Sequence, residues 1–425
     1  MPNLLPGLDR RHLDAILAEP RLRRLLAVLD GDGEETRVVG GAVRDALFGR
    51  PVKDVDLATT ALPQVTQARA EAAGFKVVPT GIAHGTLTVI VGGEPFEVTT
   101  LREDVETDGR HAVVRFGRDF AADALRRDFT INALSVCADG EIRDYAGGLD
   151  DIAARRVRFI GSARGRIRED YLRILRFFRF FAEYATGPVD AEGLHAAIHE
   201  RAGLERLSRE RIRSEFLRLL AAPRARETAA LITHAGLLDR LTGGIGDPGR
   251  LARVIAHAPP DPVLRLAAFD VASGADAARL VERLRLSNAE AARLAAYARA
   301  FPALRGRMPA PDAMQIRRLV AEFGVEAVSD AAYALDGEPR PVLDDPARTA
   351  LVAFRSGAEP VPEMPLAGRD LVAQGMARGR MIGVALAYAR EAWLAGGCRT
   401  DEAEQARLTA IAIGVASAAA ATPAR

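Results

Sequence analysis

Two aspartates one residue apart carry the strongest chemical signal in the sequence. They stand in Asp54-Val55-Asp56-Leu57, within a strand expected over Val52–Leu57. Residues i and i+2 of a strand share a face, so the two carboxylates point together while Val55 and Leu57 point into the core. Like charges this close repel, and Mg²⁺ is the hard cation that relieves such a pair. Two metal ions held there would activate an attacking hydroxyl and stabilise a leaving pyrophosphate. A bare Asp-x-Asp is more often an exposed edge strand.

A glycine pair precedes these aspartates by the right distance to serve the same chemistry. Arg37–Val39 is expected to form a strand that ends at Gly40 and Gly41, and Ala42–Leu47 is expected to form a helix. Glycines at such a turn let the backbone approach a phosphate, whose charge the helix N-terminus favours. Arg44 lies one turn into the helix, where its guanidinium can hold a triphosphate oxygen.

Glu97 is the candidate third carboxylate. It lies in a strand expected over Pro95–Thr100, with Phe96 and Val98 on the opposite face. We expect this strand to be an antiparallel neighbour of the Asp54 strand, which would bring Glu97 to the same site. The alternative is an ordinary exposed glutamate.

Composition describes a globular protein with no unusual bias in charge. The 425 residues are 48% hydrophobic and 27% charged, with a net charge of +1. Any nucleic-acid surface must therefore come from local segregation of charge. The two cysteines do not form a metal-ligand pattern. No signal-peptide pattern and no run approaching ~18 apolar residues is found, which favours a cytoplasmic protein.

The chain changes character near residue 150. Before it, strand-like runs alternate with helices, and Thr86–Val91 is a further strand candidate. After it, apolar residues recur at helical spacing, and Ser287 with Glu290 predicts a capping box at a helix start. The sequence therefore predicts an α+β class, with a small mixed or antiparallel sheet in residues 1–150 and an all-helical remainder.

Several long motifs in order resemble one known family. The segment GGAVRDALFGRPVKDVDLATTA resembles the signature of DNA polymerase β-like nucleotidyltransferases, and more narrowly that of class II CCA-adding enzymes and bacterial poly(A) polymerases. Further matching motifs are DGRHAVV, LRRDFTINAL, IREDYLRILRFFRF, LSRERIRSEF and LAGRDLVAQGMARGRMIGVAL. The resemblance is dense from residue 37 to about 220 and returns near residues 365–395.

This resemblance implies a fold, a reaction and partners. It implies a nucleotidyltransferase head in residues 1–150, a base-recognising neck in 151–222, and a tRNA-binding body and tail in 223–425. The implied reaction adds C, C and A to the acceptor end of tRNA from CTP and ATP, with Mg²⁺ as cofactor. Poly(A) synthesis, addition of only C or only A, and a non-catalytic tRNA-binding protein remain alternatives.

The neck motif suggests how a base is chosen without a template. Asp170 and Arg173 are expected on one face of a helix, at i and i+3. The carboxylate accepts from the amine of adenine or cytosine, and the guanidinium donates to the adjacent ring nitrogen. The alternative is a surface salt bridge. The resemblance also implies that Arg176 contacts the triphosphate.

The motif LRRDFTINAL supplies further candidates near the nucleotide. The resemblance places Arg127, Asp128 and Asn132 there, and the i, i+4 spacing of the last two predicts a helix face that holds sugar hydroxyls. Arg126 is expected to serve packing, and Arg211 with Glu215 to brace the neck. The neck arginines between residues 155 and 179 are expected to contact an acceptor stem in part. The neck phenylalanines and Trp393 are expected in the core.

Overall fold

The computed structural model describes residues 8–82, 85–107, 112–339 and 342–421. Its chain divides into two compact units. One holds Met1–Thr228 with Ala235–Leu237, and the other holds Ala229–His234 with Leu238–Arg425. The predicted boundaries at residues 150 and 222 stay predictions.

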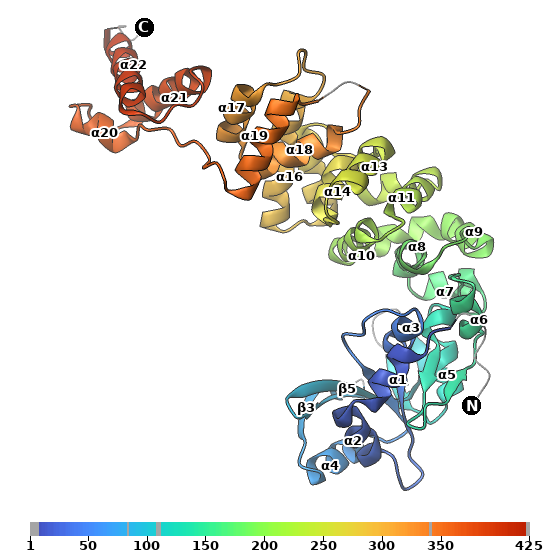
Figure 1. Cartoon of the computed structure of the whole chain (residues 1–425). Helices are drawn as coiled ribbons and strands as arrows, with labels where there is room; N and C mark the ends of the chain where they lie inside the picture. The colour runs from blue at the N-terminus through green and yellow to red at the C-terminus, as the bar shows by residue number, and fades with distance from the viewer. Residues whose placement is uncertain (1–7, 83–84, 108–111, 340–341, 422–425) are drawn as a thin grey trace. The chain divides into compact units, whose positions relative to one another are not determined.

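A mixed seven-stranded sheet forms the base of the first unit, which is blue to green in Figure 1. The strand order is β3-β4-β5-β2-β1-β8-β9. Only β2 and β5 pair in parallel, and the other neighbours are antiparallel. The predicted fold class is confirmed. The strands are β1 Thr36–Val39, β2 Asp56–Thr59, β3 Lys76–Gly81, β4 Thr86–Val91, β5 Glu94–Thr100, β8 Leu134–Val136 and β9 Ile142–Asp144, with a separate hairpin of β6 Arg102–Thr107 and β7 Ala112–Phe116.

The strand expected over Val52–Leu57 begins later than predicted. β2 starts at Asp56, and residues 52–55 precede it outside any strand. On one side β1 ends at Val39, because the chain turns into a helix there. On the other side lies β5, where Asp56 pairs with Glu97. Continuing this parallel register backwards would place Asp54 opposite Pro95, which has no N–H to donate. The segment therefore lacks partners for a ladder.

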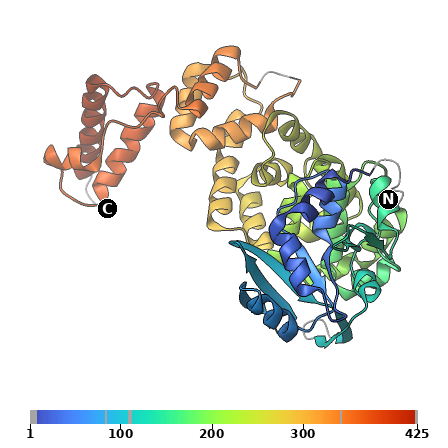
Figure 2. The same cartoon turned by 60° about the horizontal axis from the view of Figure 1, so that its bottom comes forward.

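The helix α2, Pro20–Leu29, packs on the sheet through a stripe of apolar residues. It buries Leu22, Leu25, Leu26 and Leu29 at helical spacing. It packs against α4, Pro63–Ala72, and against β1 and β4. Figure 2 shows α1, Arg11–Ala18, and α2 as the dark blue pair of helices, which contact one another.

The remaining helices of this unit follow the sheet strands or form the neck. They are α3 Gly41–Leu47, α5 Phe120–Leu125, α6 Gly148–Ala153, α7 Ala163–Glu169, α8 Leu172–Tyr184, α9 Ala191–Glu200 and α10 Arg209–Ala221, with 3₁₀ turns η2 Thr130–Asn132 and η3 Arg201–Arg206.

An aromatic core joins the neck helix α8 to the head. The ring of Phe129 lies 4.9 Å from Phe159 and 5.1 Å from Phe180, and Phe159 stacks on Phe177 at 5.3 Å. The backbone joins too, because Thr130 N donates to the carbonyl of Arg158 at 3.1 Å. The expected core role of the neck phenylalanines is confirmed, since each of Phe177, Phe178, Phe180 and Phe181 is at most 3% exposed.

The second unit is helical. Its helices are α12 Leu238–Thr242, α13 Pro248–His257, α14 Pro262–Asp270, α15 Gly274–Leu284, α16 Asn288–Leu304, α17 Ala313–Phe323, α18 Val325–Leu335, α19 Asp345–Ser356, α20 Gly368–Ala373, α21 Arg380–Ala395 and α22 Glu402–Ala421, while α11 Ala225–His234 has residues in both units. The predicted capping box of Ser287 and Glu290 opens α16. Trp393 is buried in a core shared by α20, α21 and α22, as expected. No helix among the described residues is long and apolar enough to cross a membrane.

Candidate functional site

The turn between β1 and α3 places backbone at the site and admits only glycine at its first position. Gly40 has φ +66° and ψ −117°, and its N–H donates to the carbonyl of Leu134 at 3.0 Å. A Cβ at Gly40 would lie 2.4 Å from Nη1 of Arg127, whereas one at Gly41 would have no neighbour closer than 3.7 Å. The turn therefore leaves space that the Arg127 guanidinium occupies.

Arg44 is held on all sides. Its Nε and Nη2 donate to the two carboxylate oxygens of Asp45 at 2.9 Å each, and its Nη1 donates to Oδ1 of Asn132 at 2.6 Å. Its guanidinium also lies 4.6 Å from the ring of Tyr184 and 5.0 Å from that of Phe180. The sequence placed Arg44 one turn into the helix, and the structure adds the contacts that fix its orientation.

The two arginines before Asp128 share a buried carboxylate. Nη2 of Arg126 donates to Oδ1 of Asp123 at 2.5 Å, and Nη2 of Arg127 donates to its Oδ2 at 3.0 Å. Nη1 of Arg127 also donates to the carbonyl of Asn132 at 3.2 Å. Burial would raise the pKa of Asp123, but the two arginines hold that pKa below its ordinary value.

Asp128 links the head to the neck. It is 7% exposed. Its Oδ1 accepts from Nδ2 of Asn132 at 2.8 Å, and its Oδ2 accepts from Nε and Nη2 of Arg176 in α8 at 2.7 and 2.6 Å. Burial would raise the pKa of Asp128, but the Arg176 charge and these hydrogen bonds keep that pKa below its ordinary value. The carboxylate is therefore ionised inside the fold.

The helix expected across LRRDFTINAL is not present. α5 ends at Leu125, Phe129 pairs with Phe159 as an isolated bridge, and only Thr130–Asn132 forms a 3₁₀ turn. Asp128 and Asn132 still meet, because the extended residue Phe129 and the short turn bring their side chains together. The aromatic contacts of Phe129 overrode the helical spacing.

Asp170 and Arg173 are also not on one helix. Asp170 has extended backbone, φ −151° and ψ 109°, between α7 and α8. Its Oδ1 accepts from Leu172 N at 3.0 Å and its Oδ2 from Nη2 of Arg211 at 2.7 Å. Arg173 lies in the first turn of α8, where its Nη1 donates to Glu169 at 2.5 Å and to the carbonyl of Arg166 at 2.9 Å. The two side chains thus have separate supports, and the alternative of a salt bridge between them is not what the structure shows.

These side chains surround one pocket of about 500 Å³. All nine residues predicted to bind nucleotide line it. The lining consists of Gly40, Gly41, Arg44, Arg126, Arg127, Asp128, Asn132, Asp170, Leu172, Arg173, Arg176 and Arg211. Six guanidinium groups and two carboxylates give the lining an excess of positive charge, which suits a polyphosphate.

Sequence reasoning assigned two of the lining arginines to other roles. Arg126 was expected to serve packing and Arg211 to brace the neck. Arg211 does support the neck through Asp170, but it also lines the pocket. In the sequence, Arg211 is recognisable only as a residue in the first turn of α10, after the N-cap Ser208. This position does not predict which carboxylate the Arg211 side chain binds.

Asp56 lies beside Glu97 on two neighbouring strands, and Asp54 lies just before the first of these strands. Asp56 and Glu97 are register partners in β2 and β5, and both are exposed. The predicted antiparallel pairing was wrong. β3 and β4 are antiparallel, as are β4 and β5, so β5 runs in the same direction as β3. In this direction β5 pairs with β2 in parallel. Among the described residues, no three His, Cys, Asp or Glu lie close enough together to hold a metal ion.

Asp54 acts electrostatically on Asp56. Partial desolvation by the surrounding chain raises the pKa of the Asp56 carboxyl even though the residue is exposed, the Asp54 charge raises that pKa further, and the Arg127 charge opposes the rise. The two carboxylates therefore repel one another as the sequence predicts, and Arg127 connects them electrostatically to the pocket.

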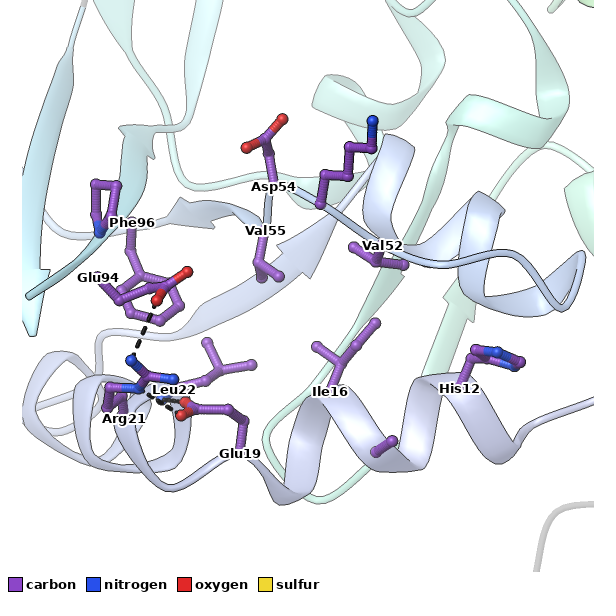
Figure 3. Close-up of a pocket in the computed structure, with 13 residues that line it drawn as sticks. His12, Ile16, Glu19, Arg21, Leu22, Val52, Asp54, Val55, Glu94 and Phe96 are labelled. Carbon is purple, nitrogen blue, oxygen red and sulfur yellow. Dashed lines mark hydrogen bonds and ion pairs between the residues drawn. The ribbon is translucent and has the colours of Figure 1, made fainter. Parts of the chain in front are cut away.

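A hollow lined by both apolar and charged side chains lies beside the segment that carries Asp54. Figure 3 shows Val55 pointing into a pocket of about 350 Å³, together with Ile16, Leu22 and Phe96, while the Asp54 carboxylate points away from it. Arg21 closes one end through Glu19 at 2.6 Å and Glu94 at 3.1 Å. Residues 52–55 lie outside the sheet, and all four of them line this hollow.

Comparison with known proteins identifies the family. A model described as the poly A polymerase head domain matches residues 36–158, and one described as the probable RNA and SrmB-binding site of polymerase A matches residues 191–244. The mitochondrial CCA tRNA nucleotidyltransferase 1 of Mus musculus is 34% identical over 391 residues, covering 90% of this chain and 88% of that enzyme. The chain belongs to the CCA tRNA nucleotidyltransferase family. The resemblance to class II CCA-adding enzymes is thereby confirmed.

Two further comparisons agree with this family. The corresponding enzyme of Danio rerio is 43% identical over 264 residues, which cover 60% of this chain and 61% of that enzyme. The crystal structure of the Bacillus stearothermophilus CCA-adding enzyme in complex with CTP is 28% identical, covers 94% of this chain and 98% of its own, and has a TM-score of 0.72.

The glycine turn gives a matched pair of variants. Gly40→Ala places a side chain at a backbone conformation that costs on the order of 1–3 kcal/mol, and its Cβ displaces Arg127. We expect a lower unfolding midpoint in urea and weaker CTP binding by calorimetry. Gly41→Ala, in the first turn of α3 with ordinary space around it, is the control for folding and should leave the unfolding midpoint unchanged. Equal unfolding midpoints for the two variants would contradict the strain assigned to Gly40.

Proposed function

We propose that this chain adds C, C and A to the 3′ end of tRNA from CTP and ATP, releasing pyrophosphate. The observation that carries the proposal is the arginine-lined pocket, in which residues from four separated motifs meet. Its family membership gives the reaction class, and the named relatives are CCA-adding enzymes. The tRNA 3′-hydroxyl would attack the α-phosphate of a nucleotide bound in this pocket.

The triphosphate would bind at the head side of the pocket. Gly40 and Gly41 offer backbone near the N-terminus of α3, and Arg44, Arg127 and Arg176 offer guanidinium groups already fixed by hydrogen bonds. Because these groups are held before the nucleotide arrives, little orientational entropy is lost on binding.

The base would be read at the neck side. Each oxygen of Asp170 accepts one hydrogen bond in the structure, and a carboxylate oxygen can accept another. Arg173 is fixed through Nη1, and a guanidinium has five N–H groups. Adenine and cytosine match this pair with an amine beside a ring nitrogen. Guanine and uracil present a carbonyl beside an N–H, and each unmatched group costs ~1–3 kcal/mol. Two such mismatches reject a base by several hundredfold or more.

Asp54 and Asp56 would hold Mg²⁺, with Glu97 assisting from the neighbouring strand. The repulsion that raises the pKa of Asp56 supports this assignment, because a divalent cation beside both carboxylates would relieve it. When bound, the metal would favour ionisation of the attacking hydroxyl and stabilise the leaving pyrophosphate. The family is generally metal-dependent. The protein's own part would be to present the two carboxylates beside the nucleotide, where the Arg127 charge already acts on Asp56.

The tRNA would contact the neck, residues 151–222, and the body and tail, residues 223–425. Most of the neck arginines have acidic partners in the structure, which lowers their share in RNA binding. Arg164 and Arg168 share Glu200 and are each more than half exposed, so this pair keeps a surplus positive charge for a phosphate. The expected cytoplasmic location stays a prediction, because some relatives are mitochondrial.

The carboxylate assignment predicts a sharp loss of turnover. Asp54→Ala and Asp56→Ala should each abolish nucleotide incorporation and leave tRNA affinity largely unchanged, because the proposed tRNA contacts lie in residues 151–425. Purified protein with Mg²⁺, tRNA lacking CCA, and labelled CTP and ATP supplied separately and together would be compared by product length. Asp139→Ala, at an exposed turn, is the matched control. Turnover retained in either variant would remove the metal assignment.

The same assay separates the alternatives for the wild-type chain. Three added residues that need both nucleotides indicate CCA addition, and long products with ATP alone indicate poly(A) synthesis. Short products that grow no longer when the second nucleotide is supplied as well indicate C-only or A-only addition. No extension indicates a non-catalytic tRNA-binding protein and overturns the proposal.

Base selection has its own prediction. Exchanging the two reading groups, Asp170→Arg with Arg173→Asp, should relax the rejection of UTP and GTP. The milder Asp170→Asn supplies an amide N–H that can donate to a base carbonyl, and should shift preference in the same direction. The measurement is the ratio of UTP to CTP incorporation at equal concentration. An unchanged ratio in both variants would exclude this pair as the base reader.

A further inference from the structure

A tyrosine at the far end of the neck helix contacts the machinery of the pocket. Tyr184 is the last residue of α8 and is 4% exposed. Its hydroxyl donates to Oδ1 of Asp45 at 2.8 Å, and Asp45 belongs to α3 in the head. Nothing in the proposed chemistry uses Tyr184, because it does not line the pocket.

Asp45 passes this contact on to Arg44. The oxygen that accepts from Tyr184 also accepts from Nε of Arg44 at 2.9 Å, and the second oxygen accepts from its Nη2 at the same distance. The guanidinium lies 4.6 Å from the Tyr184 ring. This arrangement directs Nη1 of Arg44 to Asn132, which lines the pocket. The Arg44 side chain is only 11% exposed, so few other orientations remain.

The ring of Tyr184 is itself clamped. The guanidinium of Arg50 lies 4.3 Å from it, and the ring of Phe48 lies 5.0 Å away. Arg50 in turn donates to the side chain and the carbonyl of Glu183. Two cations on one ring strengthen the attachment of α8 to α3, since an aromatic face attracts a guanidinium. Burial raises the pKa of the Tyr184 phenol, so it stays a donor in any assay near neutral pH.

We propose that Tyr184 is a positioning residue for nucleotide binding, acting through Asp45 to hold Arg44 at the pocket wall. The inference rests on the proposed function, in which Arg44 contacts the triphosphate. A long arginine has many rotamers, and each contact that removes some of them reduces the entropy lost when a phosphate binds. Tyr184 would therefore raise affinity for CTP and ATP alike without touching either base.

Two substitutions separate the hydroxyl from the ring. Tyr184→Phe keeps the ring under both guanidinium groups and removes only the hydrogen bond to Asp45. It should weaken CTP and ATP binding by a similar factor of about 3 to 10 and raise both KM values with kcat within about twofold, the size of the net contribution of one ordinary hydrogen bond. Tyr184→Leu removes the ring as well and should weaken binding further. KM for tRNA should not change in the Phe variant.

A neighbouring aromatic provides the control for a purely structural role. Phe181 is 1% exposed on the same helix, and its ring contacts the guanidinium of Arg224 at 4.2 Å. Phe181→Leu should lower the thermal midpoint and leave nucleotide affinity unchanged. Asp45→Asn should weaken nucleotide binding as Tyr184→Phe does, and the double variant should lose less than the product of the two effects, because both break one chain of contacts.

Calorimetric titration of CTP into the full-length chain, without tRNA, keeps this inference apart from the proposed function. If the wild type binds CTP and Tyr184→Phe binds it equally well, Tyr184 has no positioning role. The same conclusion follows if Phe181→Leu weakens CTP binding as much as Tyr184→Phe does. If the wild type neither binds CTP nor extends tRNA, the proposed function itself fails.

Discussion

A carboxylate taken out of water needs a cation beside it, and the cation for Asp128 comes from a different part of the chain. Arg176 in the neck helix reaches it with two hydrogen bonds. Removing one member of such a pair leaves an uncompensated charge, which is far more costly than losing an exposed ion pair. Asp128 also accepts from Asn132, which accepts from Arg44. The head and the neck are thus joined at the point where the nucleotide pocket lies, and the pocket exists only while they are joined.

The pocket concentrates six guanidinium groups, and their mutual repulsion must be offset when no nucleotide is present. Each of them has an acidic partner. Arg44 has Asp45, Arg126 and Arg127 share Asp123, Arg173 has Glu169, Arg176 has Asp128, and Arg211 has Asp170. These acids lower the net charge around the pocket. Only two of them, Asp128 and Asp170, line the pocket itself, so some N–H groups of the arginines stay available to a nucleotide. The arginines are therefore both tolerated in the free protein and oriented for a polyphosphate.

Local pattern was enough to predict much of the fold. The glycine turn, the strand over Thr86–Val91 and the capping box at Ser287 depend on neighbours in sequence, and each is found. The parallel pairing of β5 with β2 depends on how three connections close in space, and the sequence predicted the opposite direction. The helix expected around Asp128 failed because Phe129 packs on rings from the neck, a contact no local spacing reveals.

The candidate site divides in the same way. Its residues were found because their types and motifs are distinctive, and all nine predicted nucleotide-binding residues line one pocket. Their partners were not found. Glu169 holds Arg173, Arg211 holds Asp170, and Tyr184 reaches Arg44 through Asp45. A charged residue in a helical sequence has many possible partners, and only the folded chain selects one.

The strand-like pairing of residues 128–130 with 158–160 has a consequence for synthesis on the ribosome. Ile160 N donates to the carbonyl of Asp128, and Thr130 N donates to that of Arg158, so the head completes its hydrogen bonding with chain that emerges later. Domains generally fold as units in the order of translation. Here the nascent head would have unpaired backbone groups at Asp128 and Thr130 and an exposed Phe129 ring until the neck has left the ribosome. A truncated head would consequently be prone to aggregate, and cooperative folding would begin only when α8 is complete.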